Sequence, residues 1–169
     1  GDGFEDIFVG SRSIPGNYGL SSYSFILRNR NGMGVEIGYK ERYGMITDAH
    51  WVDINGDKKV DLVMCGDWMS ILILENDGKG TLTNKSKEYG VDGIYGMWNS
   101  LAFSDLNKDG ILDIIAGNTG LNHKWTASDS LPVKMYVGDF DGNGSTEPLI
   151  FYHYFSSYIP FAPLGTMTS

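Results

Sequence analysis

The chain has 169 residues, 41% of them hydrophobic and 20% charged, and it carries a formal net charge of −8. These values describe a globular chain with room for one ordinary domain and a core of its own. The negative charge argues against nucleic acid as a partner, and no run approaches the roughly 18 apolar residues of a transmembrane helix.

The expected secondary structure is all-β. Short runs of β-branched and aromatic residues alternate with clusters of Gly, Asn and Asp, and helical periodicity is nearly absent. The single cysteine, Cys65, lies in one apolar run and is expected to be a small buried side chain. In chain order, the expected strands are 6–9, 23–27, 46–52, 60–65, 71–74, 80–83, 100–103, 112–116, 133–137 and 148–154.

A nine-residue acidic motif occurs three times, at 53–61, 105–113 and 139–147. Carboxylate or amide side chains occupy its first, third, fifth and ninth positions, and an apolar run follows each copy. Residues 1–6 match the last six positions of a fourth copy. A chain with internal repeats of this kind is built from one structural unit used several times.

A second repeated element gives the rest of that unit. Residues 26–34 resemble residues 73–80, and each segment is typical of a β-hairpin with a Gly-rich tight turn. One repeat is then a strand, an acidic loop, two strands, a tight turn and a last strand, which is the blade of a β-propeller. We expect a β-propeller fragment of about three four-stranded antiparallel blades, with repeats at approximately 1–45, 46–97, 98–132 and 133–169.

The acidic loops have the donors of a calcium site. Calcium takes about six to eight oxygen ligands, whereas zinc prefers His or Cys and magnesium, the less favoured alternative, demands a stricter octahedron. Two to three such sites are expected. The expected ligands are Asp53, Asn55, Asp57, Asp61 and the Lys59 carbonyl in the first loop; Asp105, Asn107, Asp109, Asp113 and the Ile111 carbonyl in the second; and Asp139, Asp141, Asn143, Glu147 and the Ser145 carbonyl in the third. The partial copy keeps Asp2, the Phe4 carbonyl and Asp6, lacks two ligands, and is expected to be empty or weak.

The charge balance supports a cation in these loops. The complete copies hold nine carboxylates, and without them 12 acidic residues would face 13 basic ones. Like charges a few ångströms apart are costly unless a cation lies among them. Ordinary turns with Asx caps are the alternative interpretation. In the loop 53–61, Lys58 stands where the other loops have Gly, which predicts weaker binding there if that position needs a positive φ.

An EF-hand also begins with alternating acidic residues and a glycine, but the sequence argues against one. That motif needs a Glu at its twelfth position and flanking helices. The twelfth positions here are Met64, Ala116 and Ile150, and strand-like sequence follows.

These loops and their β context resemble FG-GAP or VCBS repeats, the calcium-loop blades of the integrin α-subunit propeller. Residues 96–148, with their AGNTGLN and DFDGNGSTEP segments, resemble bacterial VCBS-repeat proteins related to the ASPIC/UnbV and cartilage-acidic-protein group. The resemblance implies a seven-bladed propeller with calcium between the first two strands of a blade. It also implies an extracellular, cell-surface or periplasmic location, and it implies no reaction.

Three functions are compatible with this sequence. The first is a noncatalytic calcium-binding module for adhesion or contact with an unknown protein. The second is a carbohydrate-binding propeller with Trp125 or Trp68 in a glycan pocket. A polysaccharide-acting enzyme ranks last, because the sequence shows no paired catalytic constellation that the repeats do not already explain. The three histidines His50, His123 and His153 lie in different repeats. Open blade edges could also pair with another chain.

Overall fold

The computed structural model describes residues 4–120, 122, 123, 125 and 127–161, and within them it contains twelve β-strands and no helix. The all-β expectation is confirmed. The chain divides into two compact units, residues 1–12 with 21–119 and residues 13–20 with 120–169, which we describe separately. The described residues contain no helix that could span a membrane.

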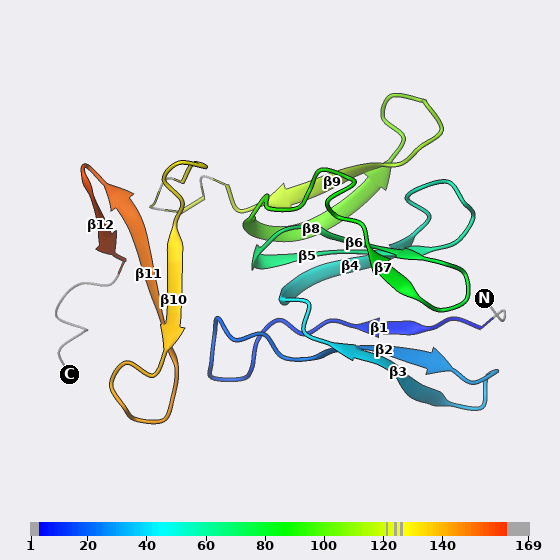
Figure 1. The fold of residues 1–169 in the computed structure, drawn as a ribbon, viewed down its shortest axis with the longest axis horizontal. Helices are drawn as coiled ribbons and strands as arrows, with labels where there is room; N and C mark the ends of the chain where they lie inside the picture. The colour runs from blue at the N-terminus through cyan, green and yellow to red at the C-terminus, as the bar shows by residue number, and fades with distance from the viewer. Residues whose placement is uncertain (1–3, 121, 124, 126, 162–169) are drawn as a thin grey trace. The chain divides into compact units, whose positions relative to one another are not determined.

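The first unit begins with a three-stranded antiparallel sheet of β1 (Ile7–Val9), β2 (Ser24–Asn29) and β3 (Val35–Glu41) (Figure 1). A tight turn joins β2 to β3, in which Arg30 donates its N–H to the Gly34 carbonyl and Met33 donates to the Arg30 carbonyl. This confirms the hairpin that the repeat at 26–34 predicts. The hairpin was expected, but the residues of its second strand, β3, were not among the expected strand ranges.

A second sheet contains the complete repeat. Its strands are β4 (Met45–Val52), β5 (Asp61–Met69), β6 (Leu72–Asn76), β7 (Leu82–Asn84), β8 (Gly96–Ser104) and β9 (Asp113–Asn118). The first four are antiparallel neighbours in chain order, as expected for a blade. The strands β8 and β9 form the next acidic-loop hairpin, and β8 joins the sheet through the end of β5.

Strand β5 is the centre of this unit because both of its faces are covered. Leu62 and Met64 pack with Ile26 of β2 in one apolar cluster. Val63 and Cys65 pack with Leu101 of β8 in a second cluster. Side chains alternate between the two faces of a strand, so one continuous apolar run feeds both clusters. The expected burial of Cys65 is confirmed.

The second unit contains a three-stranded antiparallel sheet of β10 (Lys134–Gly138), β11 (Glu147–Tyr154) and β12 (Ser157–Pro160). Asn17 anchors the segment 13–20 to this unit, because its side-chain oxygen accepts hydrogen bonds from the N–H and the hydroxyl of Thr146. The sequence did not predict β12. Between β9 and β10 the described residues form no strand, so the third repeat consists of β8 and β9 alone in that part.

Candidate metal-binding loops

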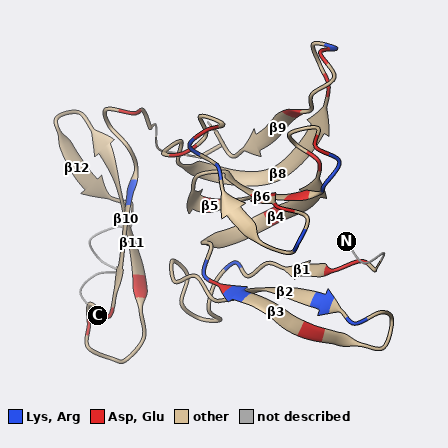
Figure 2. Cartoon of the chain, turned by 45° about the vertical axis from the view of Figure 1, so that its right-hand side comes forward, with Lys and Arg blue, Asp and Glu red and all other residues tan. Residues whose placement is uncertain are grey.

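Each complete acidic loop connects two antiparallel neighbouring strands. The loops follow β4, β8 and β10, and each ends where β5, β9 or β11 begins. Figure 2 shows acidic residues in these connections. The three copies of the motif therefore occupy equivalent places in three hairpins. Three chance matches to the motif would not be expected to share that place.

The first carboxylate of each loop holds the backbone of the loop in place. It accepts hydrogen bonds from the N–H groups of the fifth and sixth positions. These bonds are Asp57 and Lys58 to Asp53 at 3.1 and 2.8 Å, Asp109 and Gly110 to Asp105 at 3.1 and 2.9 Å, and Asn143 and Gly144 to Asp139 at 3.0 and 2.9 Å. The same side chain thus curls all three loops.

The third, fifth and ninth positions repeat their contacts in the same way. Side-chain oxygens at the third and fifth positions accept from N–H groups two residues later, as in an Asx-turn. The carboxylate at the ninth position accepts from the N–H of the second, in the pairs Ile54 to Asp61, Leu106 to Asp113 and Phe140 to Glu147 at 3.2, 2.9 and 3.0 Å.

Carboxylate oxygens converge most closely in the loop 139–147. Among the described residues, one group of three acidic side chains has ligand atoms that all lie within 4.8 Å of one another, and it is Asp139, Asp141 and Glu147. Such a spacing suits a hard cation that takes oxygen ligands. The loop therefore brings together three of its expected ligands.

The loop 53–61 differs because a lysine side chain forms an ion pair with one of its carboxylates. The Lys59 ammonium lies 2.9 Å from Asp57 Oδ2, and this hydrogen bond lowers the pKa of Asp57. The expected ligand set assigned Lys59 its backbone carbonyl, and the competing side-chain contact was missed. In the loop 105–113, the Asn107 amide donates to Asp109 Oδ2 at 2.9 Å.

Two positions of each loop have a left-handed backbone. At the sixth position φ is 67° for Lys58, 89° for Gly110 and 87° for Gly144. This confirms that Lys58 stands where glycine is favoured. The fourth position is also left-handed, and there Lys108 has a φ of 64°. The paired glycines of DGNG, at 142 and 144, were the signal that could have identified it.

The ninth carboxylate also binds the tight turn of its own repeat. Asp61 accepts a hydrogen bond from the N–H of Asn76 at 2.8 Å, and Asp6 accepts one from Asn29 at 2.9 Å. Asp6 therefore occupies the place of Asp61, as the partial motif predicted, whereas Asp2 lies outside the described residues. Asp61 is fully buried, and burial raises its pKa. Neither asparagine was among the expected ligands, although each is the last residue of its strand, β2 or β6, at the same place of the repeated segment.

The comparisons with known proteins agree with this geometry over part of the chain. Residues 53–116 match the family model of the FG-GAP-like repeat. The segment runs from the first complete acidic loop through the second and ends within β9. The predicted FG-GAP resemblance is thus confirmed for these residues, and the all-β fold is consistent with a propeller fragment. No curated protein and no solved structure matches the chain.

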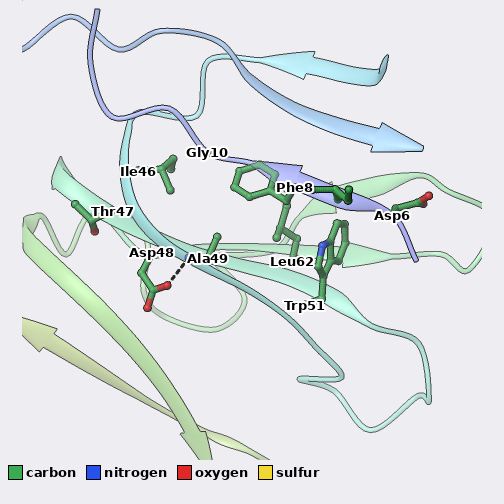
Figure 3. A pocket seen from close by; sticks show the side chains of 10 residues that line it. Asp6, Phe8, Gly10, Ile46, Thr47, Asp48, Ala49, Trp51 and Leu62 are labelled. Carbon is green, nitrogen blue, oxygen red and sulfur yellow. Dashed lines mark hydrogen bonds between the residues drawn. The ribbon is translucent and has the colours of Figure 1, made fainter. Parts of the chain in front are cut away.

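An open hollow of about 450 Å³ lies between β1 and β4 of the first unit. Figure 3 shows apolar side chains along it, among them Phe8, Trp51 and Leu62. Asp48 lies on its wall, but its oxygens accept hydrogen bonds from the N–H groups of Ala49 and Leu101. The lining therefore combines apolar side chains with the carboxylates of Asp6 and Asp48.

The described histidines do not belong to the group of Asp139, Asp141 and Glu147. His50 contacts Asp48 in the first unit, and His153 stacks edge-on against Tyr158 in the second. The Trp125 ring lies 4.6 Å from the ring of His123 and 4.7 Å from that of Phe161. Trp125, one of the two tryptophans expected in a glycan pocket, thus forms an aromatic cluster with His123 and Phe161.

Proposed function

We propose that this chain is a noncatalytic calcium-binding β-propeller module that serves extracellular adhesion or contact with another protein. The observation that carries the proposal is the convergence of Asp139, Asp141 and Glu147 in a loop whose hydrogen bonds recur in two other hairpins. The FG-GAP-like repeat at 53–116 supports the interaction role at the level of the fold.

The donors of the loops fit calcium by their chemistry. They are carboxylate, amide and carbonyl oxygens, and their backbone hydrogen bonds hold the carboxylates near one another before any ion binds. A preformed site loses less conformational entropy on binding. Calcium would supply charge neutralisation and link the two ends of a loop, while magnesium would need a stricter octahedron.

The three loops should differ in affinity. The loop 139–147 combines three converging carboxylates with glycine at both left-handed positions, so we rank it highest. The loop 53–61 carries the Lys59 contact and the left-handed Lys58, so we rank it lowest. Sites of this exposed kind commonly have dissociation constants of about 10⁻⁴–10⁻³ M, which extracellular calcium can occupy.

Calcium titration calorimetry of the wild type and of Glu147→Gln tests this proposal. The substitution removes one charge from the converging group while it keeps an oxygen. Asp129→Asn is the matched control, because it removes an equal charge from an exposed residue outside the loops. We expect calcium to bind the wild type and the control alike, and Glu147→Gln to bind one ion fewer or to bind it at least tenfold more weakly.

The same titration with magnesium separates a calcium site from general attraction to acidic groups. We expect weaker heats with magnesium than with calcium. Absence of calcium binding by the folded wild type would show that the loops are ordinary Asx turns, and the calcium-binding function would be wrong.

Carbohydrate binding is the second candidate, and the aromatic cluster of His123, Trp125 and Phe161 favours it. An indole held at a partly exposed position can stack on the apolar face of a sugar ring. A glycan array probed with the wild type and with Trp125→Ala tests it. Signals that disappear in the variant would support this candidate, and a blank array with the wild type would reject it.

A further inference from the structure

The seventh position separates the loop 53–61 from the other two acidic loops. Lys59 occupies it, where the other loops have Ile111 and Ser145. The backbone at this position is alike in all three loops, because each N–H donates to the side-chain oxygen of the fifth position, at 2.9, 2.8 and 2.7 Å. The lysine side chain is therefore what the loop 53–61 adds to the shared geometry.

The Lys59 ammonium binds a carboxylate of its own loop. Its Nζ lies 2.9 Å from Asp57 Oδ2, whereas the backbone N–H of Lys59 donates to Asp57 Oδ1. Among the described residues, no carboxylate of the loops 105–113 and 139–147 forms an ion pair. A positive charge from the chain itself thus lies in one acidic loop and not in the other two.

The adjacent turn supports the stem of this lysine. Gly78, in the turn between β6 and β7, has a φ of 76°, and a Cβ atom placed on it would lie 2.8 Å from Lys59 Cδ. The lysine stem therefore occupies the space that a side chain at position 78 would take, while its ammonium reaches Asp57. A group that is held in place in this way loses less entropy when it binds.

With the lysine in place, the carboxylates of the loop 53–61 are satisfied without a metal. Both oxygens of Asp53, Asp57 and Asp61 accept at least one hydrogen bond. In the other two loops the ninth carboxylate uses one oxygen, Asp113 Oδ2 or Glu147 Oε2, and the described residues provide no donor to the second oxygen. Those loops therefore keep a carboxylate oxygen that an ion could use.

The formal charges of the loops follow the same order. Three carboxylates and two lysines leave −1 in the loop 53–61, and three carboxylates with Lys108 leave −2 in the loop 105–113. Three carboxylates and no lysine leave −3 in the loop 139–147. Because the affinity of an oxygen site for calcium depends on the charge of its ligands, the loop 53–61 attracts the ion least.

We infer that Lys59 is a tethered cation that takes the place of calcium in the loop 53–61. This loop keeps its fold without the ion, and calcium binds there only by displacing the ammonium from Asp57. Lys59 thus determines which acidic loops respond to calcium. The inference rests on the proposed calcium function, and it assigns that function to the loops 105–113 and 139–147.

A calcium titration followed by proton–nitrogen correlation NMR tests this inference loop by loop. The amide signal of Lys58 reports on the loop 53–61, and that of Gly144 reports on the loop 139–147. Lys59→Met keeps an apolar stem and removes the charge, whereas Lys59→Arg keeps the charge. Lys79→Met is the matched control, because Lys79 is exposed on the adjacent turn and no ion pair of the described residues includes it.

The dissociation constant read from the Lys58 signal is the decisive quantity. We expect Lys59→Met to bind calcium in this loop at least about twofold more tightly than the wild type, which is within the range of an exposed ion pair. Lys59→Arg should match the wild type, and Lys79→Met should tighten binding by less than Lys59→Met does. The dissociation constant read from the Gly144 signal should stay the same in all of them.

The contrary results separate this inference from the calcium function itself. Equal affinity of the wild type and Lys59→Met would overturn the inference, and so would equal tightening in Lys59→Met and either Lys59→Arg or Lys79→Met. If calcium still moves the Gly144 signal in these cases, only the role of Lys59 is wrong. If calcium moves no loop signal in any of the proteins, the calcium function and the inference are both wrong.

Discussion

The residue that occupies the left-handed sixth position distinguishes loop 53–61 from the other two acidic loops. The sixth position is left-handed in every copy, and two copies have glycine there. Lys58 adopts the same conformation with a side chain, which costs about 1 kcal/mol or more for an ordinary residue. Loop 53–61 therefore forms under a strain that loop 139–147 does not carry.

Lys58→Gly should relieve this strain. Glycine also gains entropy in the unfolded state, so we expect the free energy of unfolding to rise by no more than about 1 kcal/mol. Urea unfolding in EGTA measures it without any contribution from calcium. Lys87→Gly is the matched control, because Lys87 is not left-handed and should lose stability on the same change. Equal loss of stability in both variants would contradict this account.

Cys65 gives a second prediction at the scale of one residue. Its side chain is 0% exposed, and burial raises the pKa of its thiol. We expect no reaction with a disulfide reagent in the folded chain at pH 8, and one thiol per chain in denaturant, because the thiolate is the reactive form. Rapid reaction of the folded chain would show that the β5 strand opens readily.

The raised pKa of Cys65 also fixes the sign of a pH effect. As the pH rises, the Cys65 thiol of the unfolded state loses its proton before the thiol of the folded state does. The contribution of Cys65 to the free energy of unfolding is therefore complete below the ordinary pKa of a thiol, and it is lost as the pH rises toward the pKa of the folded state. Cys65→Ala should therefore reduce the fall in unfolding free energy at alkaline pH and leave its acidic limb unchanged.

At the scale of elements, β5 carries more of the buried hydrophobic side chains than any other described strand of the first unit. Leu62 faces the β1–β3 sheet, and Ile73 of β6 belongs to the cluster shared with β8 and β9. Both are 0% exposed. We expect Leu62→Ala and Ile73→Ala each to lower the free energy of unfolding by about 2–5 kcal/mol, as measured in urea.

Ile37→Ala is the control for these two substitutions. Ile37 is 62% exposed, so the loss of its side chain should change the free energy of unfolding by less than about 0.5 kcal/mol. A cost as large as that of Leu62→Ala would contradict this account, because it would mean that Ile37 is buried in solution.

The strands that were missed differ from one another in the signal that they carry. The run before Cys65 is apolar because both of its faces are covered, and it was found. In β3, Val35, Ile37 and Tyr39 alternate with polar residues or glycine, so the period of two is present in the sequence and was overlooked. The strand β12 has only four residues and follows a turn in which Phe155 is left-handed, so its pattern is too short to identify a strand.

The candidate site was predictable to the extent that it repeats. Three copies of one spacing identified the expected ligands, and the structure gives these copies the same hydrogen bonds. Contacts from outside the motif could not be read in this way. The bonds of Asn29 and Asn76 to the ninth carboxylate depend on the fold of the hairpin, and the Lys59 contact depends on a side-chain conformation.

At the scale of the molecule, the division into two units separates the candidate calcium loops. The first unit contains the loops 53–61 and 105–113, and the second contains the loop 139–147. A ligand that binds only the folded form of a unit stabilises that unit, by about 2.7 kcal/mol at a hundredfold excess over Kd. Calcium should therefore act on each unit through its own loops.

Differential scanning calorimetry at low protein concentration can resolve the two effects. We expect two transitions in EGTA, both moved to higher temperature by millimolar calcium, with the larger shift in the unit that holds the loop 139–147. Glu147→Gln should abolish that shift and leave the other, whereas Asp113→Asn should reduce the other and leave this one. If either substitution removes both shifts, or if the chain unfolds in one transition, calcium does not stabilise the two units independently. The substitution of Glu147 would then also change the unfolding of the first unit, because the whole chain would unfold cooperatively.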